Sequence, residues 1–345
     1  MTTLYVARDK ALAIAKQHDS QWEVRFHLLG KQLQCLAVDP LHPRYVYCGT
    51  FDQGLWRSAD AGATWEHAGE GITSEQVMSV AVSALDQANG AGMVYAGTEP
   101  SAMFRSEDQG KSWHELVALR ELPSAPTWSF PPRPWTSHIR WIAPDPLVAG
   151  RLFAAVEAGA LLRSQDAGQS WEDRRPDGPL DTHTLVLHRL APNRLYSAAG
   201  DGFLQPGNGF AQSNDGGESW FHPDEGLVYH YLWSVAADPA DPDTVVISAA
   251  PGPQEAHNPQ TAESAIYRCS AGNPWQIMQA GLPPARGLLA SVLATNAAEA
   301  GVFYAANNLG VFRSNDTGWT WEPMPIPWPT DIQLGRAHAL VVVAE

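Results

Sequence analysis

The chain has 345 residues, of which 44% are hydrophobic and 17% charged, and its formal net charge is −15. This composition excludes a disordered chain, which needs fewer apolar and more charged residues. The acidic balance, with no cluster of Lys and Arg, argues against nucleic-acid binding. The longest apolar runs, 288–294 and 340–344, are strand-sized and the N-terminus has no basic start, so we expect a cytoplasmic protein without membrane contact.

The first predicted elements are three short β-strands, at 3–7, 11–16 and 22–27, each rich in β-formers and separated by turn residues. After them an eight-residue pattern, Ser-x-Asp-x-Gly-x-Ser/Thr-Trp, recurs along the chain. The intact copies are 58–65, 106–113, 164–171, 213–220 and 314–321, and a degenerate copy without its Asp occupies 270–275.

The residues of this box have the chemistry of a tight turn. Gly permits positive φ, and the Asp carboxylate accepts backbone N–H groups within the turn. The Trp at its end begins the next strand and buries a large ring. A structural role therefore outweighs a catalytic one for the box.

Around each box the same strands recur: one that ends in Asp-Pro, a second apolar strand, and a third that ends in Arg-Ser. Repeats of this length are typical of four-stranded propeller blades. The strand at 338–344 and the first three strands complete one further blade, so closure leaves no exposed edge. We predict one all-β domain over 1–345, a seven-bladed β-propeller with blades at 1–28 plus 337–345, 32–70, 75–117, 136–173, 182–222, 229–279 and 287–324.

The boxes resemble the Asp-box, or BNR, repeats of sialidase-like, sortilin-like and photosystem-assembly-factor-like propellers. In those families the box joins the third and fourth strands of a blade, so the resemblance implies that all box turns lie on one face. The chain lacks the Arg-Ile-Pro tripeptide that supplies one arginine of the sialidase triad. We therefore do not expect a true sialidase, although Arg140, Arg286 and Arg336 enter innermost strands and could bind an anion.

The long loops all fall on the face opposite the boxes, here called the upper face. Long loops on a rigid scaffold commonly carry binding sites. We expect their aromatic and neighbouring side chains either to wall a pocket for a small apolar or aromatic ligand or to cap the barrel against water. The candidates for substrate binding are Trp128, Phe130, Trp135, Phe203, Tyr229, Tyr231, His257 and Trp328.

Four histidines, His138, His183, His230 and His338, precede or begin innermost strands, which converge on the central channel. Neutral imidazoles that meet at one point suit a transition-metal ion, here Fe, Zn, Cu or Mn. The alternative is that they line a polar channel without metal. His138 stands seven residues before its Asp-Pro and His230 stands eight before its own. Because side chains alternate along a strand, one of the two rings should point away from the channel unless a β-bulge intervenes.

The favoured hypothesis is a metal-dependent enzyme for a small apolar or aromatic molecule; oxygenase, lyase and hydrolase chemistry stay open. Candidate catalytic groups on the upper loops are Arg140, Glu157, Asp201 and Glu255. The alternatives are a non-catalytic binding or assembly-factor propeller and a two-carboxylate glycosidase. No P-loop or similar motif is present, so we expect no nucleotide cofactor, and we expect a monomer.

Overall fold

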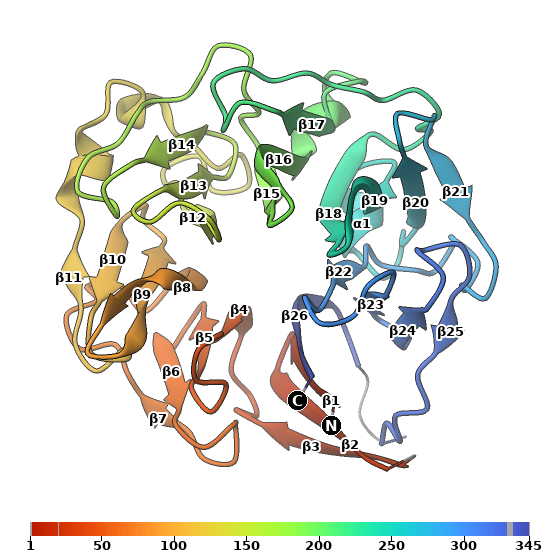
Figure 1. The fold of residues 1–345 in the computed structure, drawn as a ribbon, viewed down its shortest axis with the longest axis horizontal. Helices are drawn as coiled ribbons and strands as arrows, with labels where there is room; N and C mark the ends of the chain where they lie inside the picture. Colours follow the sequence, from red (N-terminus) through yellow and green to blue (C-terminus); the bar gives the residue numbers. More distant parts are fainter. Residues whose placement is uncertain (1, 20, 330–333, 345) are drawn as a thin grey trace.

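The computed structural model describes residues 2–19, 21–329 and 334–344. Seven antiparallel sheets surround a central axis, with the blades following one another around the ring in chain order (Figure 1). The predicted seven-bladed β-propeller is thus confirmed. The described helical elements are short: α1 (Pro253–His257) and the 3₁₀ turns η1 (Val117–Glu121), η2 (Ala125–Thr127) and η3 (Gly200–Phe203). None of the helices in these ranges is long and apolar enough to cross a membrane.

Each blade runs from an innermost strand beside the axis to an outer edge strand. In chain order the strands of the six blades that follow the N-terminal one are β4 (Leu33–Val38), β5 (Val46–Thr50), β6 (Leu55–Ser58) and β7 (Glu66–His67); β8 (Val77–Ala88), β9 (Ala91–Thr98), β10 (Met103–Ser106) and β11 (His114–Glu115); β12 (Ile139–Pro144), β13 (Leu152–Val156) and β14 (Ala160–Ser164); β15 (Thr182–His188), β16 (Ala191–Ala199) and β17 (Phe210–Ser213); β18 (Tyr231–Asp238), β19 (Asp241–Ala250), β20 (Ala265–Ser270) and β21 (Gln276–Met278); β22 (Val292–Ala294), β23 (Phe303–Asn307), β24 (Gly310–Ser314) and β25 (Glu322–Pro323).

In two blades the fourth strand is reduced to a single β-bridge. Beside β14 the outer segment pairs through a single bridge, Arg163 to Glu172, and beside β17 through another, Gln212 to Phe221. The box tryptophans Trp171 and Trp220 remain buried there. The outer edge is thus shortened, while the apolar contact between blades is kept.

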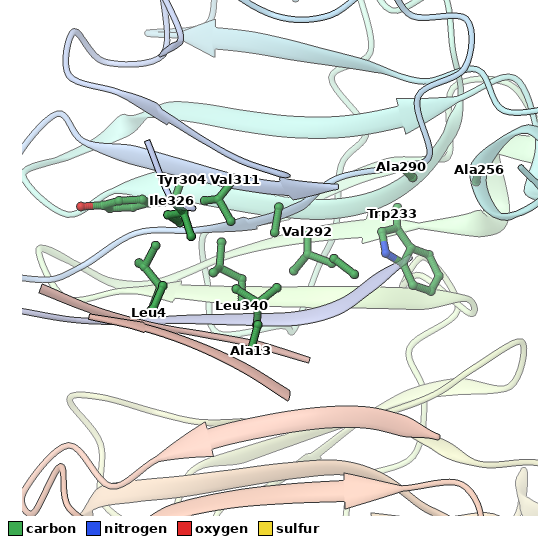
Figure 2. Packing of buried hydrophobic residues seen from close by; sticks show 14 of the residues in the cluster. Leu4, Ala13, Trp233, Ala256, Ala290, Val292, Tyr304, Val311, Ile326 and Leu340 are labelled. Carbon is green, nitrogen blue, oxygen red and sulfur yellow. The ribbon is translucent and has the colours of Figure 1, made fainter. Parts of the chain in front are cut away.

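The chain termini form one blade, as predicted. β26 (Ala337–Ala344) is its innermost strand and pairs antiparallel with β1 (Thr2–Arg8), which pairs in turn with β2 (Ala11–His18) and β3 (Gln21–His27). Figure 2 shows Leu4, Ala13 and Leu340 of this blade packing against Val292 and Tyr304 of the preceding one. The ring therefore closes by hydrogen bonds within a sheet and by apolar contact between sheets.

The box turns have the chemistry expected from their sequence. In the first, Ser58 Oγ donates to Asp60 Oδ1 at 2.7 Å and accepts from Gly62 N, while the second oxygen of Asp60 accepts from Thr64. The other intact boxes repeat this pattern. Hydrogen bonds from the side chain and backbone of Ser219 lower the pKa of Asp215 to about 2.

The arginine that ends the third strand reaches the box of the next blade. Arg57 Nη1 donates to the carbonyl of Gln109 at 2.9 Å, Arg163 to that of Gly216 at 2.8 Å, and Arg268 to that of Thr317 at 2.7 Å. These carbonyls belong to box residues with positive φ. A recurring hydrogen bond therefore ties successive blades together on the box face.

We expect that deletion of the β26 segment opens the ring. β1 stays paired with β2, but the edge that pairs with β26 becomes exposed along the whole length of β1. The truncated protein should aggregate or melt without cooperativity in size-exclusion and thermal-denaturation experiments. A monomeric truncation with a cooperative transition would contradict closure by this pairing.

Replacement of Asp108 by Ala should lower the free energy of unfolding at pH 7 by about 1–2 kcal/mol, because the N–H of Ser112 and Lys111 lose their acceptor. Despite partial burial, these bonds lower the pKa of Asp108 to about 2, so its contribution is present above its unfolded pKa of 3.8 and disappears as the pH falls through 2. The free energies of unfolding of the wild-type and Asp108→Ala proteins, measured with denaturant, should therefore converge between pH 4 and pH 2. An undiminished difference at low pH would contradict this role of the carboxylate.

Candidate functional site

A β-bulge recurs where the innermost strands begin at the upper face. In β12, Ile139 pairs with Val156 and Trp141 with Ala155, which leaves Arg140 as the extra residue. The same skip in five other innermost strands singles out Gln34, Met78, His183, Trp233 and His338. Since a bulge re-aims the side chain of its extra residue, the strands present one side chain each at the channel mouth.

A cavity of about 1170 Å³ occupies this mouth. All the bulge residues except His183 line it, and the upper loops add apolar and charged side chains. Its walls include Phe51, Phe130, Phe203, Tyr231 and Trp233 on the apolar side and Arg133, Arg140, Glu157, Asp181, Asp201 and Arg336 on the charged side. Such a mixed lining is typical of a small-molecule site.

A chain of charged groups runs along one wall. Arg133 holds Glu99 with two hydrogen bonds of 2.6 Å, and His138 lies between two carboxylates, 3.3 Å from Glu99 and 2.8 Å from Glu157. Burial alone would lower the pKa of His138, but Glu157 and Glu99 outweigh it and raise that pKa. Burial would likewise raise the pKa of Glu157, yet the charge and hydrogen bond of His138 and the charge of Arg140 hold it well below its usual value. Glu157 is therefore a largely enclosed, ionised carboxylate.

Next to this carboxylate, His183 has a free nitrogen. Its Nδ1 donates to the carbonyl of Leu232 at 2.6 Å, which leaves the lone pair on Nε2. Nε2 is buried without a hydrogen-bond partner and lies 3.8 Å from both Glu157 Oε1 and Asp181 Oδ1. One donor atom from each of these three side chains lies within 4.8 Å of the others. Burial lowers the pKa of His183, so the imidazole is neutral.

Asp181 differs from Glu157 although the two are neighbours. Burial and the charge of Glu157 raise the pKa of Asp181 to about 7. Asp201, from η3, accepts the backbone N–H groups of Leu180 and Asp181, at 3.1 and 2.9 Å, and so holds the loop that carries Asp181. Asp201 thus acts on the position of Asp181.

On another side of the cavity two guanidinium groups share one indole. The guanidinium carbon of Arg140 lies 4.5 Å from the ring centre of Trp233, and that of Arg336 lies 4.4 Å from it. Burial and the charge of Arg140 lower the pKa of Arg336 to about 10. Nearby, the Tyr231 hydroxyl and His257 Nε2 share a hydrogen bond of 3.0 Å, and burial holds the pKa of His257 well below its usual value.

The structure brings together many of the residues selected from the sequence and leaves others outside. The predicted residues that line the cavity are Phe130, His138, Arg140, Glu157, Asp201, Phe203, Tyr231, His257 and His338. Those outside its lining are Trp128, Trp135, His183, Tyr229, His230, Glu255 and Trp328.

The residues outside the lining are used in other ways. Trp128 is buried in a core cluster and donates to Ser124 Oγ, whereas Trp135 is 79% exposed. Tyr229 donates to Glu263, and Trp328 packs against Phe26. The predicted aromatic wall is therefore built in part from other side chains, Phe51 and Trp233 among them.

The four histidines do not form one ligand set. His338 donates to Asp9 at 2.9 Å, and His230, with a buried Nδ1 that lacks a partner, lies outside the cavity lining. The set that the described residues assemble is Glu157, Asp181 and His183. The physical reason is register: the bulge lies five residues before the Asp of Asp-Pro in β12 and β18, whereas His230 lies eight before it.

The same register could have found the residues that sequence reasoning missed. Trp233 and Arg140 both stand five residues before an Asp-Pro, and Asp181 stands at the position relative to His188 that His138 has relative to Asp145. Alignment of the innermost strands on the Asp of Asp-Pro, with His188 in its place in β15, instead of on their histidines, selects Trp233 and Asp181.

Comparison with known proteins identifies the fold of this chain but assigns the chain to no family. No protein-family model and no curated protein matches the chain. Among solved structures, an ancestral GH74 enzyme matches with a TM-score of 0.65 and 17% identity, over 88% of this chain and 40% of its own. YCF48 bound to D1 peptide matches with 0.55 and 18%, over 85% and 82%, and a GH74 xyloglucanase from Xanthomonas campestris with 0.51 and 18%, over 93% and 59%. The chain spans only 40% of the first enzyme's length, and at such identities the likeness shows a BNR-like propeller fold alone.

The absence of a Cβ at Gly200 leaves space for the carboxylate of Asp181. A Cβ at Gly200 would lie 2.0 Å from Asp181 Oδ2 and 2.9 Å from His183 Cε1, whereas one at Gly178, also in the cavity wall, would lie 3.4 Å from its nearest neighbour. We expect Gly200→Ala to displace the Asp181 carboxylate and to lower the free energy of unfolding by about 1–3 kcal/mol. Gly178→Ala should change neither.

Denaturant unfolding and crystal structures of the two glycine variants check this expectation. An unmoved Asp181 in Gly200→Ala would show that the loop yields elsewhere and that Gly200 does not set its position.

Proposed function

We propose that this protein is a metal-dependent enzyme whose active site is the upper cavity, with one divalent ion held by Glu157, Asp181 and His183. The observation that carries the proposal is the free Nε2 of His183. A side chain only 1% exposed leaves a lone pair without a hydrogen-bond partner, at equal distances from two carboxylates. A buried polar atom without a partner costs free energy, and a metal ion would supply that partner.

The distances suit ligands of a shared ion. Separations of 3.8 Å are too long for hydrogen bonds. Donor atoms placed about 2.0–2.4 Å from one ion lie roughly 3–4 Å from each other. The hydrogen bond from His183 Nδ1 to the Leu232 carbonyl fixes the ring in the tautomer that a metal requires, which is the usual outer contact of a ligating histidine.

The donor set favours zinc or manganese among the ions considered. One imidazole and two carboxylates depart from the two-histidine, one-carboxylate set of iron oxygenases, and no thiol belongs to the group. Bound there, such an ion would act as a Lewis acid and lower the pKa of a bound water. We therefore favour hydrolysis over oxygenation.

The cavity also favours a ligand with an apolar part. Phe203 and Tyr231 lie with their ring centres 6.5 Å apart in an edge-to-face arrangement, and Phe130 contacts the ring of His138. Phe203 is 51% exposed, so its ring can cover a ligand that enters from the upper face. The Arg133–Glu99 pair and the Glu157–His138 bond would keep the charged wall in place during turnover.

The proposal predicts metal binding that depends on His183. Purified protein loaded with Zn²⁺ or Mn²⁺ and dialysed should retain close to one equivalent per chain by elemental analysis. His183→Gln should lose most of it, with at least a tenfold weaker affinity. The matched control is His188→Gln: His188 is buried on the same strand, but both of its nitrogens have partners, the carbonyl of Asp238 and the N–H of Leu190.

Activity is tested with the same proteins. Zinc-loaded wild-type protein should hydrolyse some member of a panel of aryl esters and aryl phosphates, and a chelator or the His183→Gln exchange should abolish the turnover. Wild-type protein that holds none of the ions Zn, Mn, Fe or Cu would contradict the proposal. It would leave the binding propeller as the better account, in line with the fold likeness to YCF48.

A second candidate is a glycosidase that uses Glu157 and Asp181 directly. It is favoured by the proximity of these carboxylates, with donor atoms within 4.8 Å, and by the difference between the lowered pKa of Glu157 and the pKa of Asp181, raised to about 7. Hydrolysis of a glycoside that persists in the presence of a chelator would select this candidate.

A further inference from the structure

The upper cavity contains cationic groups that the protein itself does not neutralise. The arginines elsewhere are mostly matched: Arg133 binds Glu99 through two oxygens, and Arg151 binds Asp145 at 2.6 Å. Arg336 differs, because the described residues give its guanidinium only the ring of Trp233. Its Nε is buried and makes no hydrogen bond.

The guanidinium group of Arg140 also lacks a close anionic partner. It is 7% exposed, its Nε makes no hydrogen bond, and its one ion pair, to Glu157, is long at 3.6 Å. That carboxylate already accepts from His138 at 2.8 Å. Two guanidinium groups of like charge therefore lie on the same indole, and no described carboxylate lies within hydrogen-bond distance of either.

Two like charges placed beside one ring raise the free energy of the folded protein unless a bound anion compensates for them. Two like charges near one ring repel each other, and burial adds the cost of lost hydration. The indole offsets part of this cost through cation–π contact. Both arginines line the cavity, and no hydrogen bond joins either guanidinium group to an acceptor among the described residues.

We propose that Arg140 and Arg336 bind an oxyanion of the ligand, a carboxylate or a phosphate group, over the indole of Trp233. The planar donor edge of a guanidinium matches two oxygens of such a group, which a lysine does not. This assignment rests on the proposed function in one respect, the placement of the ligand in the upper cavity, and needs no metal. It narrows the ligand from an apolar molecule to an amphiphilic one, with an anionic end at the arginines and an apolar part toward Tyr231 and Phe203.

The position of Trp233 supports a built site. Trp233 is the extra residue of the bulge in β18, 5% exposed, and its ring also contacts those of His183 and His257 at 4.7 and 4.4 Å. Nδ1 of His257 is buried without a partner, while its Nε2 lies 3.0 Å from the Tyr231 hydroxyl. An unpartnered imidazole nitrogen thus belongs to the ring that packs on the same indole as the two arginines.

The test uses the full chain stripped of metal by a chelator. Isothermal titration with benzoate, phenyl phosphate and the neutral benzamide measures whether charge is required. We expect benzoate or phenyl phosphate to bind at least tenfold more tightly than benzamide, and the tighter of the two anions identifies the group. Inorganic phosphate alone shows how much of the affinity the anionic end supplies.

Variants assign the binding to these residues. Arg140→Met and Arg336→Met should each weaken the anion at least tenfold, since each removes charge-assisted hydrogen bonds worth about that much. Arg286→Met is the matched control, because Arg286 also precedes an innermost strand but is exposed and outside the cavity lining. Circular dichroism verifies folding, and Arg336→Lys, which keeps the charge, should weaken the anion less than Arg336→Met does.

Equal binding of benzamide, absence of anion binding, or unchanged affinity in both arginine variants would overturn the assignment. The metal proposal is measured separately, since Zn²⁺ retention should survive in Arg336→Met and anion binding should survive in His183→Gln. A protein that holds zinc but no anion disproves only the oxyanion site. A protein that holds the anion but no metal disproves only the metal-dependent enzyme.

Discussion

The requirement that the ring close governs this structure. A single blade has two apolar faces and can bury them only against its neighbours, so an open array would expose a face at each end. The pairing of β26 with β1 removes that exposure by joining the two ends of the chain in one sheet. Closure has a second effect: it arranges the innermost strands around one channel, so residues far apart in sequence line the same cavity at its mouth.

The two faces of the ring use the same residue types in opposite ways. On the box face Arg57, Arg163 and Arg268 each donate to a carbonyl of the next blade, and these contacts stabilise the ring. On the upper face Arg140 and Arg336 lack such partners. The histidines show the same contrast within one strand, because His188 is fully bonded and His183 is not. Unpartnered polar groups of this kind that gather around a cavity are what a binding site requires.

The bulges explain how a repetitive fold acquires a site. A regular strand would alternate its side chains between the two neighbouring blades, and few would face the channel mouth. One extra residue at each strand entry turns a side chain toward the mouth, and six blades supply side chains as different as Gln34, Met78 and Trp233. The scaffold can therefore stay constant while the chemistry of the mouth varies with these few positions.

The sequence by itself determined the blade count, the closure by the terminal strands and the box turns, because these depend on short-range patterns. Ser58, Asp60 and Gly62 lie within one turn, and the hydrogen bonds among them follow from their spacing. It also selected loops whose residues line the upper cavity, among them those with Glu157, Asp201 and His257.

Only the tertiary structure decided which of these side chains meet. The free Nε2 of His183 depends on the Leu232 carbonyl of the next blade, and the juxtaposition of Arg140, Trp233 and Arg336 depends on the bulges in β12 and β18 and on the segment that enters β26. A shift of one residue in such a strand reverses the direction of a side chain, and the distance from Asp-Pro marks the position of a bulge only once the bulge itself is known.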